Sequence, residues 1–323
     1  MSVVTATTDL SKAGEPAPAA TPAAPLPKRR RFGARDRRDY LVFLALVIPN
    51  VALIIAFTYR PLIQNIQYST LNYTLGAPTA RRVGFDNYVQ FFTSNDASQI
   101  LLTTLIFTVV TVGWSMGLGL LIALGLNKKI PGAGFAQAAV FSPFVLSGVG
   151  VGLAWVFIFD PTVGALGAVL RSVGLSSPQW FNNPNLSLVM VCLVYIWKNM
   201  GYAAVIYLAG LQAISKDVLE AASIDGANAN RTFWAIKLPL LSPTTFFLLV
   251  TSVLNSLQAF DLIKAMTPTG RGTNTLIYES YLQAFGGYNR AGYSATISTI
   301  LFVILVIFTL VQLTLVERRV HYT

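Results

Sequence analysis

Residues 220–239 read EAASIDGANANRTFWAIKLP, a polar stretch of twenty residues between two long apolar runs. Just before it, Ser215 is expected to cap a short helix whose apolar side includes Ala222. Gly226 then permits a turn that a side chain would hinder, and Pro239 is expected to stop a second helix. A segment that interrupts apolar runs and still carries helix signals is expected to dock another molecule.

The composition of the chain indicates its class. Hydrophobic residues make up 54% of the 323 residues and charged residues 11%, with a mean hydropathy of +0.59. Soluble domains usually carry about 25% charged residues. The sequence therefore predicts an all-α polytopic membrane protein. One cysteine, Cys192, and one histidine, His321, leave no disulfide within the chain and no clustered Cys/His metal site, so no metal-ligating residue is predicted.

The apolar runs predict six transmembrane helices. Each has about 20 or more mainly apolar residues, the length that crosses a hydrocarbon core of about 30 Å. They lie near 40–59, 100–126, 135–159, 185–213, 244–264 and 293–316. An even number of spans places both termini on the same side of the membrane.

These spans divide the chain into three parts. Residues 1–39 form a tail that ends in a basic cluster, and its Ala/Pro/Thr-rich start is expected to be disordered. Residues 40–318 form the transmembrane domain, which includes the polar loop 214–243, and residues 319–323 form a second tail.

The basic residues predict the orientation. Fifteen of the 23 Lys and Arg lie in residues 1–39, in the loops at 128–129 and 214–243, and after the last span at 318–319. By the positive-inside rule, both termini and the 214–243 loop are cytoplasmic. This distribution accounts for the net charge of +10 without a nucleic-acid partner.

Three ionisable residues within the spans call for an explanation, because each costs on the order of 2.5–3.5 kcal/mol to insert. Asp261 and Lys264 are three residues apart, which suits either an ion pair or side chains that snorkel to the interface. Lys198 lies near mid-span beside Asn199 and close to Tyr202. It either faces a water-filled path or pairs with a carboxylate, of Asp261 or of a partner subunit.

The fifth span carries a polar stripe on an otherwise apolar helix. Its members include Asn255, Ser256 and Gln258. Such a stripe either lines a pathway or holds two helices together.

The 220–239 segment resembles the EAA loop of ABC-importer permeases, which docks into a cleft on the ATP-hydrolysing subunit. The match includes Glu220, Ala221, Ala222, Gly226, Ile236, Leu238 and Pro239, with Asp225 in the turn. From about residue 40 to 318 the chain resembles the carbohydrate-uptake branch of these permeases, the maltose and glycerol-3-phosphate type. Within that branch it is most similar to the first permease subunits of glycerol-3-phosphate or glycerophosphodiester importers.

The resemblance implies a type I importer fold in the bacterial inner membrane and a set of partners. These are a second homologous permease, two ATPase subunits that bind ATP and Mg, and an extracytoplasmic substrate-binding protein. No cofactor and no catalytic residue are expected in this chain, which lacks a GxxxxGK[ST] phosphate loop. The eight EAA-loop residues named above would couple transport to ATP hydrolysis.

The resemblance also implies a substrate pathway. Lys198, Asn199 and Tyr202 fall where maltose-type permeases have substrate contacts, and Ser256 and Gln258 fall where they carry pathway asparagines. The maltose permease has an apolar side chain in place of the lysine. Since Lys binds phosphate as a point charge, an anionic substrate is favoured over a neutral sugar or oligosaccharide, which stays the alternative.

Two other classes of membrane protein are weighed against this interpretation. A secondary transporter would show inverted repeats with broken helices in both halves, and no such pairing is visible in the sequence. A membrane enzyme would concentrate His, Cys or carboxylate residues, yet only Asp261 lies within a span. Co-purification with an ATPase subunit would separate the importer from both.

Overall fold

The computed structural model describes residues 34–128, 131–312 and 314, which fall into two units divided between Thr58 and Tyr59. The predicted disorder at the start of the chain and the predicted C-terminal tail lie outside the described residues. The first unit is one helix, α1 (Ala34–Ile54), which continues into a single π-helical turn, η1 (Ile55–Tyr59). Most of its apolar side chains are exposed, as on a helix that faces lipid.

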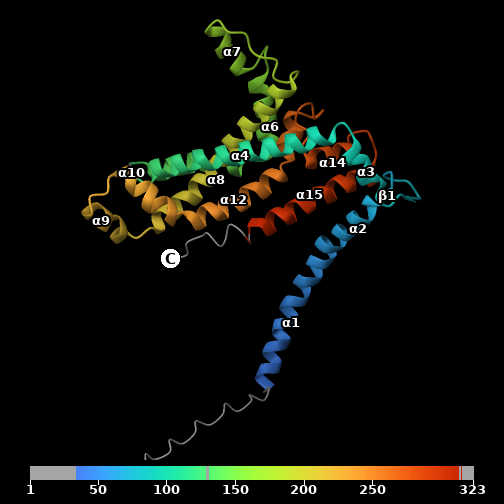
Figure 1. Ribbon diagram of the computed structural model, residues 1–323, viewed down its shortest axis with the longest axis horizontal. Helices are drawn as coiled ribbons and strands as arrows, with labels where there is room; N and C mark the ends of the chain where they lie inside the picture. The colour runs from blue at the N-terminus through green and yellow to red at the C-terminus, as the bar shows by residue number, and fades with distance from the viewer. Residues whose placement is uncertain (1–33, 129–130, 313, 315–323) are drawn as a thin grey trace, which may run out of the picture. The chain divides into compact units, whose positions relative to one another are not determined.

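The second unit holds the remaining helices and one short hairpin (Figure 1). In chain order they are α2 (Arg60–Ser69), β1 (Leu71–Asn72), β2 (Arg81–Arg82), α3 (Asp86–Thr93), α4 (Ala97–Leu126), α5 (Ala133–Val145), α6 (Gly148–Phe159), α7 (Ala165–Ser172), α8 (Pro184–Ala213), α9 (Lys216–Ile224), α10 (Ala229–Thr232), η2 (Phe233–Lys237), α11 (Leu238–Leu240), α12 (Ser242–Leu257), α13 (Asp261–Met266), α14 (Leu276–Phe285) and α15 (Ala291–Val311). The two strands pair antiparallel, with Leu71 opposite Arg82.

Four helical stretches of the described residues are long and apolar enough to cross a membrane. They are Arg38–Ser69, Ala97–Leu126, Pro184–Ala213 and Ala291–Val311. Two bent helix pairs bring the number up to six if each pair is one span: Ala133–Val145 with Gly148–Phe159, bent by 97°, and Ala229–Leu240 with Ser242–Leu257, bent by 62°.

Two of the expected spans are thus broken helices. The apolar run at 135–159 bends after Val145, where Leu146 is extended, because Pro143 and the closely spaced glycines that follow are poor helix formers. The run at 244–264 is interrupted after Leu257, and a separate helix begins at Asp261. Hydropathy alone does not distinguish a straight span from a broken one.

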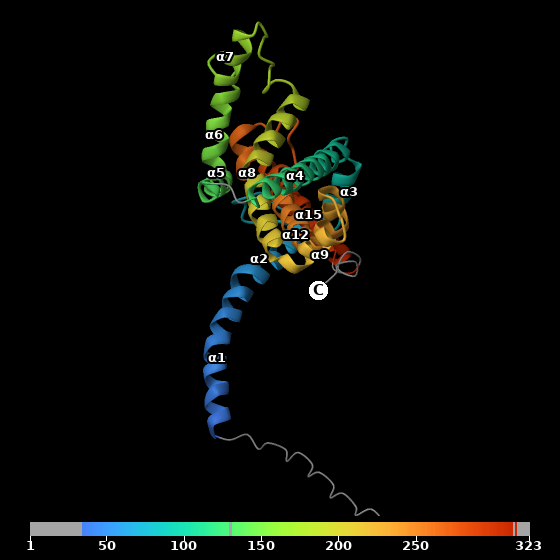
Figure 2. The ribbon, with the colours of Figure 1, turned by 90° about the vertical axis from the view of Figure 1, so that its left-hand side faces the viewer.

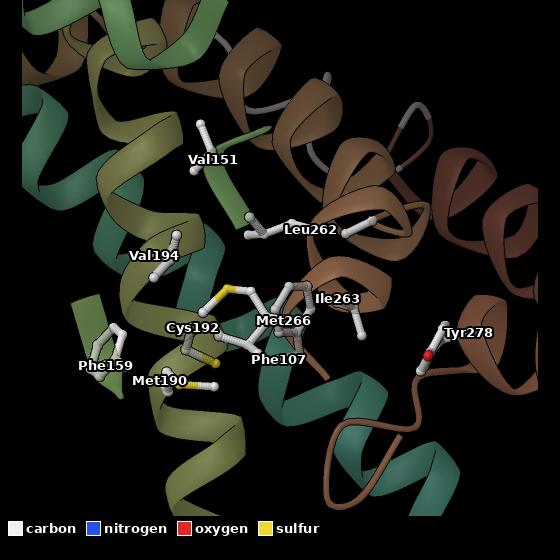
Figure 3. Close-up of a cluster of buried hydrophobic side chains, with 12 residues drawn as sticks. Phe107, Val151, Phe159, Met190, Cys192, Val194, Leu262, Ile263, Met266 and Tyr278 are labelled. Atoms are coloured by element: carbon white, nitrogen blue, oxygen red, sulfur yellow. The ribbon is translucent and has the colours of Figure 1, made fainter. Parts of the chain in front are cut away.

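The helices of the second unit pack around several small-residue contacts. Gly119 of α4 lies directly against Ala203 of α8, where a Cβ would overlap its neighbour, so these two long helices approach closely. Figure 3 shows Phe107, Met190 and Leu262 meeting in one buried cluster, drawn from α4, α8 and α13. α6 and α7 project beyond the other helices in both views (Figure 1, Figure 2).

Candidate functional site

The predicted coupling loop forms two short helices joined by a tight turn. Ser215 caps α9, since its hydroxyl accepts a hydrogen bond from the backbone N–H of Asp217 at 3.2 Å. At the other end, Gly226 has a φ of +75°, and the N–H of Ala227 bonds back to the carbonyl of Ala222 at 2.9 Å. This is the Schellman arrangement, which ends a helix and sets the direction of the next segment. The cap and the turn predicted from the sequence are both confirmed.

The turn presents its side chains outward. Glu220, Ala221 and Asp225 are exposed, whereas Ala222 is buried against the rest of the loop. Ile224, at the end of α9, is 86% exposed. The end of α9 therefore presents an apolar side chain at its surface. Ile224 was not among the residues predicted from the sequence. The helical periodicity of α9 places it off the apolar side of that helix, which the sequence alone could have indicated.

Pro239 does not stop the second helix of the loop, contrary to the expectation. The helix runs from α10 through the π turn η2 into α11, and its bend follows Leu240. The N–H of Leu238 bonds to the carbonyl of Phe233, which widens the turn just before the proline ring. Such a wide turn accommodates a residue without an N–H. Ile236 and Leu238 are half-buried beside it.

Three of the predicted pathway residues lie together in a narrow cleft. Asn199 and Tyr202 of α8 and Asn255 of α12 line it. From α4 come Thr111 and Ser115, which the sequence reading missed because hydroxyls in a span are usually satisfied within their own helix. The Ser115 hydroxyl is buried without a hydrogen-bond partner among the described residues. The cleft therefore offers polar groups at the contact of three helices.

The other two predicted pathway residues of the fifth span, Ser256 and Gln258, do not line this cleft. Ser256 is 2% exposed, and its hydroxyl is 3.0 Å from that of Thr111 and 3.5 Å from that of Thr108. The polar stripe was expected either to line a pathway or to hold two helices together. These contacts show Ser256 holding α12 to α4. Gln258 follows the end of α12 and is exposed.

Lys198 points away from this cleft, toward the break between α5 and α6. Its ammonium group donates hydrogen bonds to the carbonyl oxygens of Phe144 at 2.7 Å and of Pro143 at 3.3 Å. These carbonyls belong to the last turn of α5, where no further helical N–H reaches them. A lysine at this position satisfies them and suits the negative end of the helix dipole.

The close approach of α5 and α8 brings Lys198 to this position. A Cβ on Gly201 would overlap the backbone carbonyl of Val140, so only glycine fits there. Tyr202 stacks on Phe144, with ring centroids 4.8 Å apart. Gly201 thus serves helix contact, and α8 continues through it without unwinding.

Asp261 and Lys264 form no ion pair within the described residues. Lys264 instead lies over the ring of Tyr281, 4.5 Å from the centroid, and near Phe260 at 5.5 Å. Asp261 lies against Gly148, the first residue of α6. At the break between α5 and α6, the Lys198 ammonium therefore faces the C-terminus of α5, and the Asp261 carboxylate lies near the N-terminus of α6. Helix dipoles favour a positive charge at the first of these ends and a negative charge at the second.

Comparison with known proteins identifies the family. Residues 115–322 match the binding-protein-dependent transport system inner membrane component family. The chain belongs to this family. The matched range includes the EAA-like loop, Lys198 and the cleft residues of α8 and α12, and it begins after Thr111. The chain is therefore a permease subunit of an ABC importer of the inner membrane, and a secondary transporter is set aside.

Two related permeases align with most of the chain. The sn-glycerol-3-phosphate transport system permease protein UgpA of Agrobacterium fabrum is 37% identical over 280 residues, which are 86% of this chain and 95% of that protein. UgpA of Rhizobium meliloti is 35% identical, again over 86% of this chain and 95% of that protein.

Solved structures support the type I importer fold. A bacterial ABC transporter that imports the acidic polysaccharide alginate matches with a TM-score of 0.77 at 24% identity, over 87% of this chain and 96% of that one. A bacterial alginate ABC transporter in complex with its alginate pentasaccharide-bound periplasmic protein matches with a TM-score of 0.76 at 23% identity, over 85% and 93%.

Proposed function

We propose that this permease forms half of the translocation pathway for sn-glycerol-3-phosphate or a glycerophosphodiester. The similarity to UgpA proteins over 95% of their length carries the proposal, since those proteins are named for glycerol-3-phosphate transport. Lys198 adds a physical reason. Its ammonium has three N–H donors, and two of them are used on α5 carbonyls. The third is left to meet an anionic group.

The cleft would form the neighbouring part of the pathway. Asn199, Tyr202 and Asn255 supply amide and hydroxyl groups that suit the hydroxyls of a glycerol moiety. Ser256 would hold α12 to α4 behind this surface, and Gln258 would lie at the end of the path. A second, homologous permease would provide the opposite wall, since a single chain supplies only one side of such a route.

The α9–α10 loop would couple this pathway to ATP hydrolysis in two partner subunits that bind ATP and Mg, with no cofactor in this chain. The distribution of basic residues supports a cytoplasmic position for this loop and for both termini. Its exposed Glu220, Asp225 and Ile224 would contact the ATPase. A substrate-binding protein would dock on the opposite face.

Uptake measurements test the substrate. The complete complex in proteoliposomes, supplied with the binding protein encoded beside it, is expected to import radiolabelled sn-glycerol-3-phosphate or glycerophosphocholine, and glycerol only weakly. ATP-dependent import of a neutral oligosaccharide such as maltotriose, with no import of the phosphate compounds, would overturn the substrate and leave the permease role intact.

A charge at the exposed tip of α9 is expected to weaken ATPase docking. Ile224→Asp should lower the affinity of the permease for its ATPase subunit by on the order of 30-fold, because a central apolar anchor contributes about 2 kcal/mol or more. Co-purification and ATPase stimulation measure the effect, with Ile224→Leu as the matched control. The side chain is 86% exposed, so the permease should fold normally. Unchanged co-purification of Ile224→Asp would contradict the docking surface.

A further inference from the structure

A polar cavity lies at the end of the bundle opposite the coupling loop. Its volume is about 590 Å³, and it is lined by the start of α4, the 267–275 loop and α14. α4 begins at this cavity. Its other end packs against the end of α8 that precedes the coupling loop. A helix of 30 residues spans about 45 Å, so the cavity and the loop are on opposite faces.

A buried carboxylate forms the floor of this cavity. Glu279 is 8% exposed and has no ion-pair partner among the described residues. Its two oxygens each accept one amide hydrogen bond, from Asn274 Nδ2 at 2.8 Å and from Gln283 Nε2 at 2.7 Å. A carboxylate offers about four acceptor sites, so half of its capacity is unused, and a buried charge without a counter-charge is costly.

These hydrogen bonds fix both amides with their oxygens turned away from Glu279. Gln283 Oε1 and Asn274 Oδ1 are buried, and neither has a donor within the described residues. Asn274, whose Oδ1 lies against Gly270, and Gln283, itself 8% exposed, both line the cavity. A flip of either amide would cost its bond to the carboxylate. The lining of the cavity also includes a second carboxylate, of Asp96.

Two guanidinium groups, of Arg290 and Arg271, line the same cavity. Arg290 donates to Gln90 at 2.8 Å and lies over the ring of Tyr293, 4.2 Å from its centroid. Arg271 is exposed at the rim. Neither guanidinium forms an ion pair with Glu279 in the part of the chain that the structure describes.

We propose that this cavity is a socket for a lysine or arginine side chain of the substrate-binding protein. An ammonium or guanidinium supplies the donors and the positive charge that Glu279 and Gln283 lack. The volume favours a side chain over a bare ion, because a single water occupies only about 30 Å³. The proposal rests on the proposed function, in which a binding protein docks on the face opposite the coupling loop.

The test removes the charge and keeps the shape. Glu279→Gln places an amide between the other two amides, so at least one of them must turn its N–H groups toward the cavity. The affinity of the binding protein for the complex in nanodiscs, measured by surface plasmon resonance, is expected to fall by on the order of 10-fold or more. Asp86→Asn is the control, since it removes one exposed negative charge outside this cavity.

A double-mutant cycle identifies the lysine or arginine of the binding protein that enters the cavity. Each exposed Lys and Arg of the binding protein is changed to Gln and tested against wild-type permease and Glu279→Gln. One of them is expected to lose its effect in the Glu279→Gln background. A folded Glu279→Gln complex that binds the protein as tightly as wild type would overturn the socket. So would a wild-type complex whose affinity for the binding protein changes only with added Ca²⁺. Absence of any binding to the wild-type complex would instead count against the proposed function.

Discussion

Lys198→Met is expected to lower both the stability of the assembled importer and its import of the anionic substrate. The substitution leaves the carbonyls of Pro143 and Phe144 without their ammonium donor at the break after α5. An unsatisfied buried carbonyl costs about 1–3 kcal/mol. The thermal midpoint of the purified complex and the initial rate of sn-glycerol-3-phosphate import measure the two effects.

Two further variants separate the roles of Lys198. Lys198→Gln supplies two N–H donors without a charge, so it should recover much of the stability and little of the anion import. Lys264→Met is the matched control, because that ammonium lies over the Tyr281 ring and caps no carbonyl. Its effect on stability should stay near 0.5–1 kcal/mol. Normal stability together with normal import in Lys198→Met would refute both roles.

Local signals in the sequence were enough to predict the coupling loop. Ser215 and Gly226 act on backbone groups a few residues away, so their residue types alone indicate the cap and the turn. The apolar runs likewise predicted an all-helical membrane fold, because their length is set by the bilayer. The orientation of the termini rests on charge alone and stays a prediction.

The partners of the mid-membrane residues could not be predicted in the same way. Lys198 meets carbonyls 54 and 55 residues earlier in the chain, and they are free only because α5 breaks there. Hydropathy does not show this break, which follows from Pro143 and the glycines after it. Pro239 shows the same limit, since a π turn two residues earlier lets the helix pass through it.

Gly226→Val is expected to reduce import by tenfold or more and leave the permease inserted in the membrane. Gly226 has a φ of +75°, a region that costs an L-residue roughly 1–2 kcal/mol and disfavours β-branched side chains most. No atom lies near the position of a new Cβ, so the effect comes from the backbone alone. A turn forced out of this conformation would redirect α10 relative to α9 and displace the exposed surface that meets the ATPase.

Gly226→Asn is the matched control for this prediction. Asparagine adopts the left-handed conformation more readily than other side chains, and the open space accommodates it. Import by Gly226→Asn should therefore stay close to the wild-type rate, with ATPase stimulation by the loaded binding protein retained. Gly226→Val should keep the basal ATPase rate of the free ATPase subunit and lose that stimulation. If both variants import equally well in proteoliposomes, the turn at Gly226 does not transmit ATP hydrolysis to the pathway.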